Sequence, residues 1–348
     1  MSTGSAYQWI HRVWYEDAPF GWLLLPLSAL YRLISVTRAL LYRCGFFKMH
    51  AASVPVVVVG NITAGGTGKT PTVIWLVSEL RVRGFRPGII SRGYGGGRSG
   101  TSMRVDADSD PGVVGDEPVL LARRADCPVV VDADRVRAAA MLVEDGVDVI
   151  IADDGLQHAR LKRDFEICVI DGARGLGNHR LLPAGPLRES PQRLEDVDQV
   201  LVNGQLRRQG ELDALTGQDI LVFELRAIAA CRLNGSLTQP IAQFADTTVH
   251  AVAGIGNPAR FFDLLRAQQI QVIEHAFADH APLNKSELEF GDDFAVFMTE
   301  KDAVKLGTNF ADKVWYIPVE LHMDPGQAAP LIGQIESRLR ACVRDRHD

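Results

Sequence analysis

The feature that most constrains this 348-residue chain is the stretch VPVVVVGNITAGGTGKTPTVIWL at residues 54–76. Its four consecutive valines, Val56–Val59, predict a parallel strand that is buried on both faces. The glycine-rich loop 60–70 ends in Gly-Lys-Thr, and an apolar helical stretch follows to about Arg83. A strand, a loop of this kind and a helix in this order form the context in which such a loop binds phosphate. The chain is therefore expected to contain a nucleotide-binding P-loop.

Within the P-loop, glycines allow the backbone to curl until its N–H groups converge on phosphate oxygens. Lys69 is expected to reach the β- and γ-phosphates, and the Thr70 hydroxyl to ligate Mg²⁺. The expected nucleotide-binding residues are Thr63, Ala64, Gly65, Gly66, Thr67, Gly68, Lys69 and Thr70. Thr63 stands where the usual pattern has a glycine, and the remaining loop residues outweigh that departure.

A second acidic element lies in the run VDVIIADDGLQH at residues 147–158. Val147–Ala152 reads as a buried strand, and Asp153 and Asp154 follow at its carboxyl end. Ligands of open α/β sheets gather at that edge. The pair is therefore expected to coordinate Mg²⁺, although adjacent aspartates also occur as plain turn formers.

Further polar side chains are candidates for the chemistry. Asp116 and Glu117 precede a helical run, where acids are also ordinary helix-start residues. His280 lies in a polar turn, and an isolated loop histidine often has no chemical role. Arg92 and Arg188 lie in glycine-rich loops after strands, which suits an anionic substrate.

Two strings resemble known motifs only in part. The lysine of T-E-K-D at residues 299–302 is one position late for the guanine-reading motif of GTPases, so a GTPase is not predicted. The string G-I-G-N-P at residues 254–258 is half of a dinucleotide-binding fingerprint, and a lone G-x-G is weak evidence.

The N-terminal segment combines apolar and basic residues. Residues 18–31 are uncharged, but Pro26 and Arg32 count against a spanning helix of about 20 apolar residues. Leucines and Ile34 recur at helical spacing on one side, and polar residues such as Ser28 follow the other. This pattern favours an amphipathic helix lying in the membrane surface. A helix packed on the protein core is the alternative.

Composition excludes other classes. The net charge of −6 argues against nucleic acid as a partner, yet the first 50 residues hold five basic and two acidic side chains. Five scattered cysteines with no C-x-x-C pair indicate neither a disulfide framework nor a zinc site, so a reducing, cytoplasmic setting is expected. No secretory signal peptide is predicted.

Strands expected at 54–59, 87–91, 128–131, 147–152, 165–170 and 199–202 alternate with helices, which predicts a P-loop NTPase-type α/β fold with a doubly wound, mainly parallel sheet. A smaller α/β lobe should follow a β-hairpin around Asn234-Gly235. We expect an N-terminal membrane-associating segment at residues 1–48 and a P-loop kinase domain at residues 49–219. A hairpin linker at residues 220–240 should lead to the smaller lobe at residues 241–325, and a C-terminal helix at residues 326–348 should pack on the first lobe.

Taken together, these pieces resemble one family, the tetraacyldisaccharide 4'-kinases of Gram-negative bacteria. The resemblance rests on V-G-N-I-T-x-G-G-T-G-K-T-P, S-R-G-Y-G-G, G-D-E-P, D-D-G-L-Q-H, R-L-L-P-A-G-P-L-R-E and T-E-K-D, which occur in this order behind the N-terminal helix. It covers roughly residues 10–306. The Thr63 departure belongs to the family pattern as well.

The resemblance implies an activity. It implies transfer of the ATP γ-phosphate to the 4'-hydroxyl of tetraacyldisaccharide 1-phosphate, an acylated glucosamine disaccharide lipid, to give lipid IVA in lipid A biosynthesis. The implied cofactors are ATP and Mg²⁺. The implied location is peripheral, on the cytoplasmic face of the inner membrane, against the inner-leaflet surface. No nucleic acid and no protein partner are predicted.

The resemblance also implies roles for residues. Asp116 and His280 match an Asp–His pair that activates the hydroxyl, and Lys69 acts on the phosphates. The implied metal-site residues are Thr70, Asp153, Asp154 and Glu189, with the direct ligand among the two aspartates left open. The residues expected to contact substrate are Asn61, Arg92, Glu117, His158 and Arg188, of which the two arginines are argued from charge.

Two other classes remain as alternatives. A partition-type P-loop ATPase that cycles on membranes is the first, although such proteins carry lysine where this chain has Ala64. A non-enzymatic membrane scaffold with a vestigial P-loop is the second.

Overall fold

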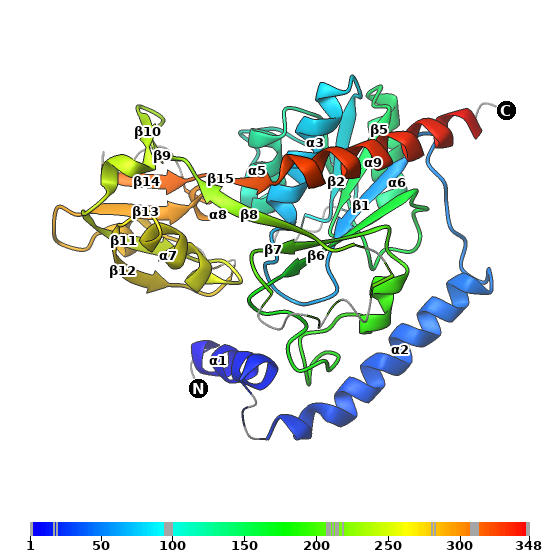
Figure 1. The fold of residues 1–348 in the computed structure, drawn as a ribbon, viewed down its shortest axis with the longest axis horizontal. Coiled ribbons are helices and arrows are strands. Elements are labelled where there is room, and N and C mark those ends of the chain that lie inside the picture. Colours follow the sequence, from blue (N-terminus) through cyan, green and yellow to red (C-terminus); the bar gives the residue numbers. More distant parts are fainter. Residues whose placement is uncertain are drawn as a thin grey trace.

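A computed structural model of the protein shows two α/β lobes and an N-terminal helical arm (Figure 1). The residues that the structure describes are 3–16, 18, 20–93, 100–206, 210, 212, 216–217, 219–279, 281, 283–306 and 313–345. His280 lies outside these described residues.

Within the described residues, nine strands form the larger sheet, in the order β15-β8-β7-β6-β1-β5-β2-β4-β3. Their bounds are β1 Val56–Gly60, β2 Pro87–Ser91, β3 Met103–Val105, β4 Val129–Val131, β5 Val149–Asp153, β6 Phe165–Asp171, β7 Gln199–Asn203, β8 Leu221–Ala227 and β15 Val319–Met323. The strands from β8 to β4 are parallel, and only the edge pairs β15–β8 and β3–β4 are antiparallel. The predicted doubly wound, mainly parallel sheet is confirmed.

The central strand β1 is fully covered on both faces, as the valine run predicts. Val57 and Val59 belong to one core cluster, and Val56 and Val58 belong to another on the opposite face. The helices α3 (Lys69–Val82), α5 (Asp116–Arg124) and α9 (Pro325–Asp345) contribute to the first cluster, and α6 (Arg135–Glu144) contributes to the second. Two further helical turns, α4 (Pro111–Val114) and η2 (Pro191–Glu195), lie in the connecting segments of this lobe.

The smaller lobe contains a second sheet, in the order β10-β9-β14-β13-β11-β12. Its elements are β9 Ala229–Arg232, β10 Thr238–Pro240, η3 Ile241–Phe244, β11 Thr248–Ala253, α7 Pro258–Arg266, β12 Gln271–Ala276, η4 Lys285–Leu288, β13 Ala295–Thr299, α8 Glu300–Ala303 and β14 Val314–Ile317. The hairpin predicted around Asn234-Gly235 is present as the antiparallel pair β9–β10, and Gly235 adopts a positive φ of 74° in its turn.

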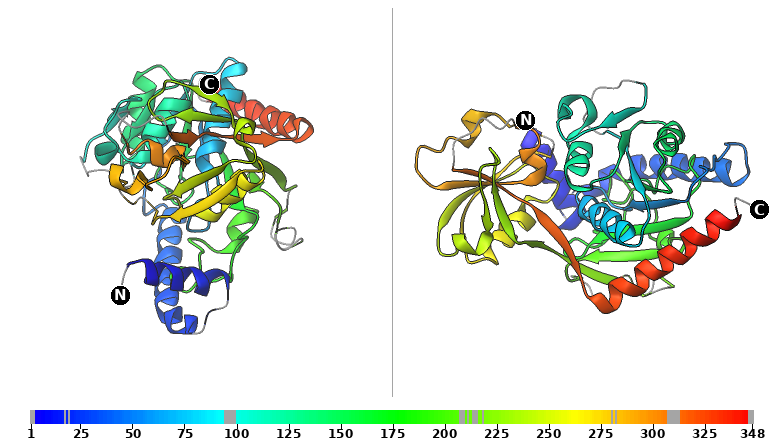
Figure 2. Two further views of the ribbon diagram at one scale, coloured as in Figure 1. Left: turned by 90° about the vertical axis from the view of Figure 1, so that its left-hand side faces the viewer. Right: turned by 90° about the horizontal axis from the view of Figure 1, so that it is seen from above.

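Two crossings join the lobes, one from β8 to β9 and one from β14 to β15. Since β8 pairs with β15 in the larger sheet, the residues 220–240 divide between the two sheets. The domain boundaries themselves stay a prediction. The views in Figure 2 show the smaller lobe projecting from one end of the larger sheet, while α9 runs along the larger lobe.

The N-terminal arm consists of α1 (Thr3–Tyr15), η1 (Gly21–Leu24) and α2 (Leu25–Arg43). The segment Gly21–Arg43 is long and apolar enough to cross a membrane by length and composition, and very little of it is buried. Three side chains join α2 to the larger lobe: Ser28, Tyr31 and Arg38 donate to the carbonyl oxygens of Leu181, Arg188 and Gln157 at 2.7, 2.9 and 3.2 Å. The leucine side of α2 is exposed.

The C-terminal helix α9 packs on the larger lobe. Leu331, Ile332, Ile335 and Leu339 are buried in the same core cluster as α3. These four apolar side chains attach α9 to the core of the larger lobe.

Ile335 therefore provides a test of this packing. Replacing Ile335, which is 0% exposed, with alanine should lower the free energy of unfolding by about 2–5 kcal/mol, because it leaves a cavity between α9 and the sheet. The measurement is urea denaturation followed by circular dichroism. The matched control on the same helix is Val343→Ala, which should change the free energy by about 0.5 kcal/mol or less because Val343 is partly exposed. Equal losses for the two variants would show that α9 does not pack on this core.

Candidate active site

The P-loop occupies the turn between β1 and α3. Gly65 and Gly68 adopt positive φ angles of 107° and 105°, which only glycine adopts without strain. A Cβ at Gly68 would lie 2.7 Å from Nδ2 of Asn203, which donates a 3.0 Å hydrogen bond to the carbonyl oxygen of Thr67. Asn203, the last residue of β7, therefore contacts the loop and supports its conformation. The hydroxyl of Thr67 is buried and has no hydrogen-bond partner.

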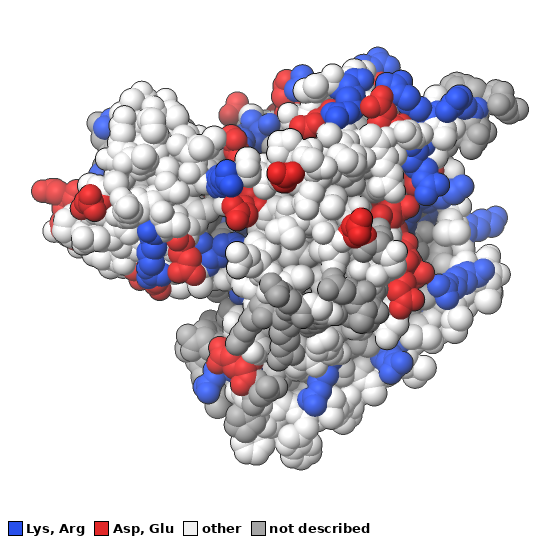
Figure 3. All heavy atoms as spheres, in the orientation of Figure 1, with Lys and Arg blue, Asp and Glu red and all other residues white. Residues whose placement is uncertain are grey.

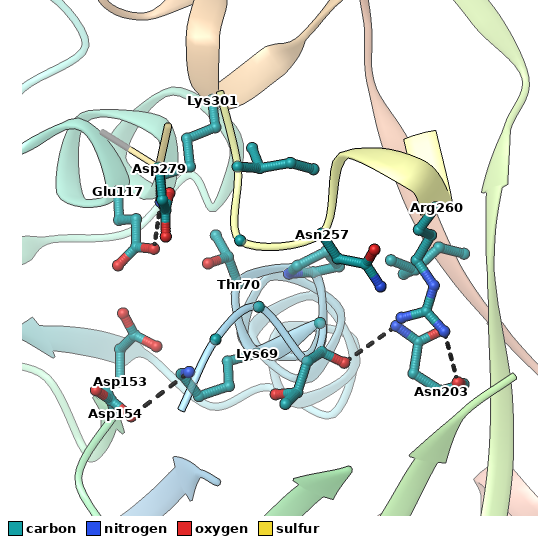
Figure 4. A pocket seen from close by; sticks show the side chains of 18 of the residues that line it. Lys69, Thr70, Glu117, Asp153, Asp154, Asn203, Asn257, Arg260, Asp279 and Lys301 are labelled. Atoms are coloured by element: carbon teal, nitrogen blue, oxygen red, sulfur yellow. Dashed lines mark hydrogen bonds and ion pairs between the residues drawn. The ribbon is translucent and has the colours of Figure 1, made fainter. Parts of the chain in front are cut away.

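Lys69 begins α3 and points to the acidic end of β5 (Figure 4). Its Nζ lies 3.6 Å from Oδ1 of Asp154. Arg188 contacts the same carboxylate through one guanidinium nitrogen at 2.9 and 3.0 Å. Burial alone would raise the pKa of Asp154, but Lys69 and Arg188 outweigh it and hold that pKa well below its usual range. Asp154 is therefore an ionised carboxylate between two cations.

Asp153 differs from its neighbour in its partners. It is 2% exposed, Ser91 lies 3.4 Å from its Oδ2, and its Oδ1 has no hydrogen-bond partner. Burial, together with the charges of Glu117 and Asp154, raises the pKa of Asp153 to about 7. A buried carboxylate oxygen without a partner is costly unless a cation reaches it. Asp153 therefore has the electrostatic character of a cation ligand.

The smaller lobe supplies the opposite wall of the site (Figure 4). Lys301 lies 3.0 Å from Oε1 of Glu117 and 3.3 Å from Oδ1 of Asp279. Glu117 and Asp279 outweigh the effect of burial and raise the pKa of Lys301 above its ordinary value. This cluster joins the first lobe, through Glu117, to the loop after β12.

A second contact between the lobes lies beside the P-loop. Arg260 of α7 donates to the carbonyl oxygen of Asn203 at 2.8 Å and lies 3.3 Å from Asp171. A Cβ at Gly256 would lie 2.7 Å from the backbone nitrogen of Gly66. The two lobes are therefore in direct contact at the phosphate site, and glycine at position 256 allows that approach.

Between these walls lies a cavity of about 900 Å³. It is lined by P-loop residues 65–70, by carboxylates of both lobes, by the loop after β11 and by Tyr31 of α2. The cavity thus extends from the phosphate loop to the N-terminal arm. Its mixed lining suits a polar ligand with an apolar end.

Most of the residues predicted from sequence line this cavity. They are Gly65, Gly66, Thr67, Gly68, Lys69, Thr70, Arg92, Glu117, Asp153, Asp154, His158 and Arg188. Burial, with Arg135 and Arg92 nearby, lowers the pKa of His158 to about 4, so its imidazole is neutral near pH 7. His158 therefore offers hydrogen bonds rather than a charge.

Other predicted residues support the cavity from behind. Asn61 is fully buried and donates to the carbonyl oxygen of Gly65 at 3.3 Å. Thr63 forms a β-bridge with Leu187, and the backbone nitrogen of Ala64 donates to the carbonyl oxygen of Pro186 at 2.7 Å. The structure thus places these residues in the support of the P-loop.

Two predicted residues are held by basic partners outside the cavity lining. Glu189 lies 3.2 Å from Arg193, one helical turn away. Asp116 is 5% exposed at the start of α5, and Lys305 of the smaller lobe lies 3.9 Å from its Oδ2. His280, predicted as its partner, lies outside the described residues, but Asp279 lines the cavity.

Sequence reasoning missed several residues of the smaller lobe and of β7. The cavity-lining residues without a predicted role include Asn203, Ile255, Gly256, Asn257, Arg260, Asp279 and Lys301. Most of them belong to the strings G-I-G-N-P and T-E-K-D or to the segment before His280. Both strings are partial matches to other motifs, and T-E-K-D also contributes to the family resemblance, but neither pattern assigns a role to its residues.

Comparison with known proteins identifies a consistent set of relatives. Residues 20–339 match the family described as tetraacyldisaccharide-1-P 4'-kinase. The tetraacyldisaccharide 4'-kinase of Nitrosococcus oceani is 45% identical over 328 residues, 94% of each chain. That of Alkalilimnicola ehrlichii is 51% identical over 304 residues, 87% of this chain and 88% of the relative.

A solved structure is similar as well. The "apo" form of LpxK from Aquifex aeolicus in complex with ATP superposes with a TM-score of 0.76 at 28% sequence identity. The match covers 92% of this chain and 99% of that chain. The similarity therefore extends over both lobes.

The contact at Gly256 yields a test of the assembled site. Gly256→Ala should weaken binding of a nucleoside triphosphate about 10- to 100-fold, because the added methyl group meets the P-loop backbone and overpacking costs about 1–3 kcal/mol. The measurement is titration with a fluorescent nucleotide. Gly333→Ala is the control, because a Cβ there meets nothing within 4 Å. Unchanged affinity in Gly256→Ala would contradict the contact between the lobes.

Proposed function

This chain belongs to the tetraacyldisaccharide-1-P 4'-kinase family of lipid A biosynthesis, and from that premise we propose how its own residues carry out phosphate transfer. The acceptor is the 4'-hydroxyl of a tetraacyldisaccharide 1-phosphate, and the donor is ATP. The observation that carries the proposal is the cavity that extends from Lys69 of the P-loop to Tyr31 of the exposed helix α2. The family match leaves the partition-type ATPase without support.

The triphosphate would lie along the P-loop. Backbone N–H groups of residues 65–70 converge there, and α3 begins at Lys69, so its N-terminal dipole faces the phosphates. Lys69 already lies beside Asp154, and an arriving phosphate would compete with that carboxylate for its ammonium group. Positioning and charge neutralisation of this kind are the main terms in phosphoryl transfer.

The residues present fit a Mg²⁺ ion. Asp153, whose buried Oδ1 has no hydrogen-bond partner, and Thr70 both line the cavity. Asp154 and Glu189 have arginine partners, so we propose Asp153 and Thr70 as ligands. Within the described residues, no three His, Cys, Asp or Glu side chains form a metal cluster by themselves, which is consistent with a site completed by phosphate oxygens. The ion would neutralise the charge of the phosphates.

The acceptor hydroxyl needs a base, and we assign this role to Asp116 and His280. A carboxylate beside an imidazole fixes its tautomer and stabilises its protonated form. The positions of two residues support the assignment. Asp116 is buried at the interface of the lobes, and Asp279, which directly precedes His280 in the chain, lines the cavity. The base would therefore be assembled from both lobes.

The sugar headgroup would occupy the part of the cavity near α2. Arg92, His158 and Glu117 line the same cavity as Tyr31 of α2. We propose that Arg92 binds substrate phosphate, while neutral His158 donates or accepts a hydrogen bond at a sugar hydroxyl. Arg188 contributes indirectly, because its guanidinium is held by Asp154.

The acyl chains would remain in the membrane surface beside α2. The exposed apolar side of the helix includes Leu23, Leu27, Leu30, Leu33 and Ile34. The helix α2 contains arginines and no acidic residue. Figure 3 shows basic side chains spaced along its otherwise uncharged surface. Such a helix binds anionic lipid by area and charge together. Hydrogen bonds from Ser28, Tyr31 and Arg38 hold α2 alongside the larger lobe. We propose that α2 and this lobe lie together on the cytoplasmic face of the inner membrane.

The transfer itself is the first test. Wild-type protein with Mg-ATP carrying a γ-phosphate label should label tetraacyldisaccharide 1-phosphate in detergent micelles, and Lys69→Ala should reduce the rate by about 100-fold or more because phosphate charge is left uncompensated. The readout is labelled lipid separated by thin-layer chromatography. Hydrolysis of ATP without labelled lipid in the wild type would overturn the proposal.

The base assignment predicts non-additive losses. Asp116→Ala and His280→Ala should each lower kcat by about 100- to 10,000-fold, and the double variant should lose little more, because the two groups act as one unit. The measurement is kcat under saturating ATP. Losses that multiply in the double variant would contradict a shared role.

Membrane binding by α2 is tested with vesicles. Leu30→Glu combined with Ile34→Glu should abolish flotation with vesicles of anionic phospholipid, because it buries two charges in the apolar boundary. The control is Val82→Glu, which alters an exposed apolar residue of α3 away from the arm. Flotation of the double variant at the wild-type level would place the binding surface elsewhere.

A further inference from the structure

A buried carboxylate organises the T-E-K-D turn of the smaller lobe. Asp302 is 0% exposed. Its Oδ2 accepts hydrogen bonds from the backbone nitrogen of Gly254 at 2.9 Å and from the Thr299 hydroxyl at 2.6 Å. Its Oδ1 accepts from Nζ of Lys305 at 2.8 Å. Lys305 is thus fixed by an ion pair within its own lobe.

The same ammonium group also lies near Asp116 and near the residue that follows His280 in the chain. It donates at 3.3 Å to the carbonyl oxygen of Ala281, which directly follows His280 in the chain. It also lies 3.9 Å from Oδ2 of Asp116 in the other lobe. The side chains of Lys305 and Asp116 are 11% and 6% exposed, so solvent screens this charge pair only weakly.

Lys305 and Lys301 therefore differ in what they reach. Lys301 lines the cavity, between Glu117 and Asp279, where a substrate can contact it. Lys305 is not among the cavity-lining residues; its ammonium group donates to Asp302 and to the carbonyl oxygen of Ala281 and lies 3.9 Å from Asp116. Its chemistry is suited to holding other groups in place.

We propose that Lys305 is a positioning residue for phosphate transfer: it aligns Asp116 of the larger lobe with the backbone of Ala281 in the smaller lobe. The proposal rests on the proposed function, because it needs Asp116 to act in the base. The ammonium group of Lys305, fixed by Asp302, attracts the carboxylate of Asp116 across the interface and donates to the backbone of Ala281, which follows His280 in the chain. Displacement of reacting groups by about 1 Å can cost about 100-fold in rate.

The test compares variants that separate alignment from folding. Lys305→Met leaves Asp302 buried and unpaired, which by itself can unfold the lobe. The decisive variant is therefore Lys305→Met combined with Asp302→Asn, which removes both charges. It should retain the melting temperature within a few degrees and the wild-type KM for ATP within about threefold, while kcat falls about 100-fold. Lys305→Arg, which keeps a cation, should recover part of that loss. Lys285→Met, on exposed η4, is the matched control and should have wild-type kcat.

Each outcome decides between the two roles. Wild-type kcat in the folded charge-neutral variant would overturn the proposal and leave Lys305 as a structural partner of Asp302. A melting temperature that falls together with kcat, with Lys305→Arg no better, would overturn it as well.

A second background separates this proposal from the proposed function. On Asp116→Ala, the charge-neutral pair should cause no further loss, since the carboxylate to be aligned is gone. If Asp116→Ala itself keeps wild-type activity, the base assignment fails. If Asp116→Ala is inactive and the charge-neutral variant is active, only the role of Lys305 fails.

Discussion

The structure depends on the position of β1 at the centre of a parallel sheet. In a parallel sheet every strand presents its carboxyl end at the same edge, and the loops that follow must meet there. Register then determines which residues meet: Val59 pairs with Asp153, so the P-loop begins beside the aspartate pair. On the other side, β6 and β7 deliver Asp171 and Asn203 to the same edge. The phosphate site is thus a consequence of strand order, and it needs no long-range placement of individual loops.

The charges at this edge are balanced in two different ways. Asp154 has Lys69 and Arg188 as partners within the larger lobe and is ionised without any ligand. Asp153, one residue earlier, is buried among other carboxylates and keeps an oxygen without a partner. Adjacent residues of one sequence motif therefore have different electrostatic states. The difference arises because the chain turns after Asp153 and gives Asp154 a positive φ of 49°, which directs its side chain to the cations.

Local patterns predicted the core of this arrangement and failed where contacts are distant in sequence. The P-loop, its strand, the following helix and the six central strands could be found because burial and glycine content are properties of short segments. The antiparallel edge strand β15 pairs with β8 across nearly a hundred residues, and no local pattern specifies such a partner. The same holds for Lys301 and Arg260, whose roles arise only when the smaller lobe contacts the P-loop. Glu189 lies 3.2 Å from Arg193, and its role at a metal site, implied by the resemblance, stays a prediction.

The sequence predicts an amphipathic N-terminal helix, and in the structure polar side chains of this helix contact the larger lobe. Ser28 and Tyr31 turn to the protein, so the polar side attaches the helix to the larger lobe and the apolar side remains exposed. Tyr31 donates to the carbonyl oxygen of Arg188, the guanidinium of Arg188 holds Asp154, and Asp154 lies beside Lys69. Only three contacts therefore separate an exposed apolar helix from the lysine of the phosphate loop. In the proposed function the acyl chains of the substrate stay in a membrane beside α2, and this short chain of polar contacts would hold the helix at a fixed distance from the loop that binds the phosphates.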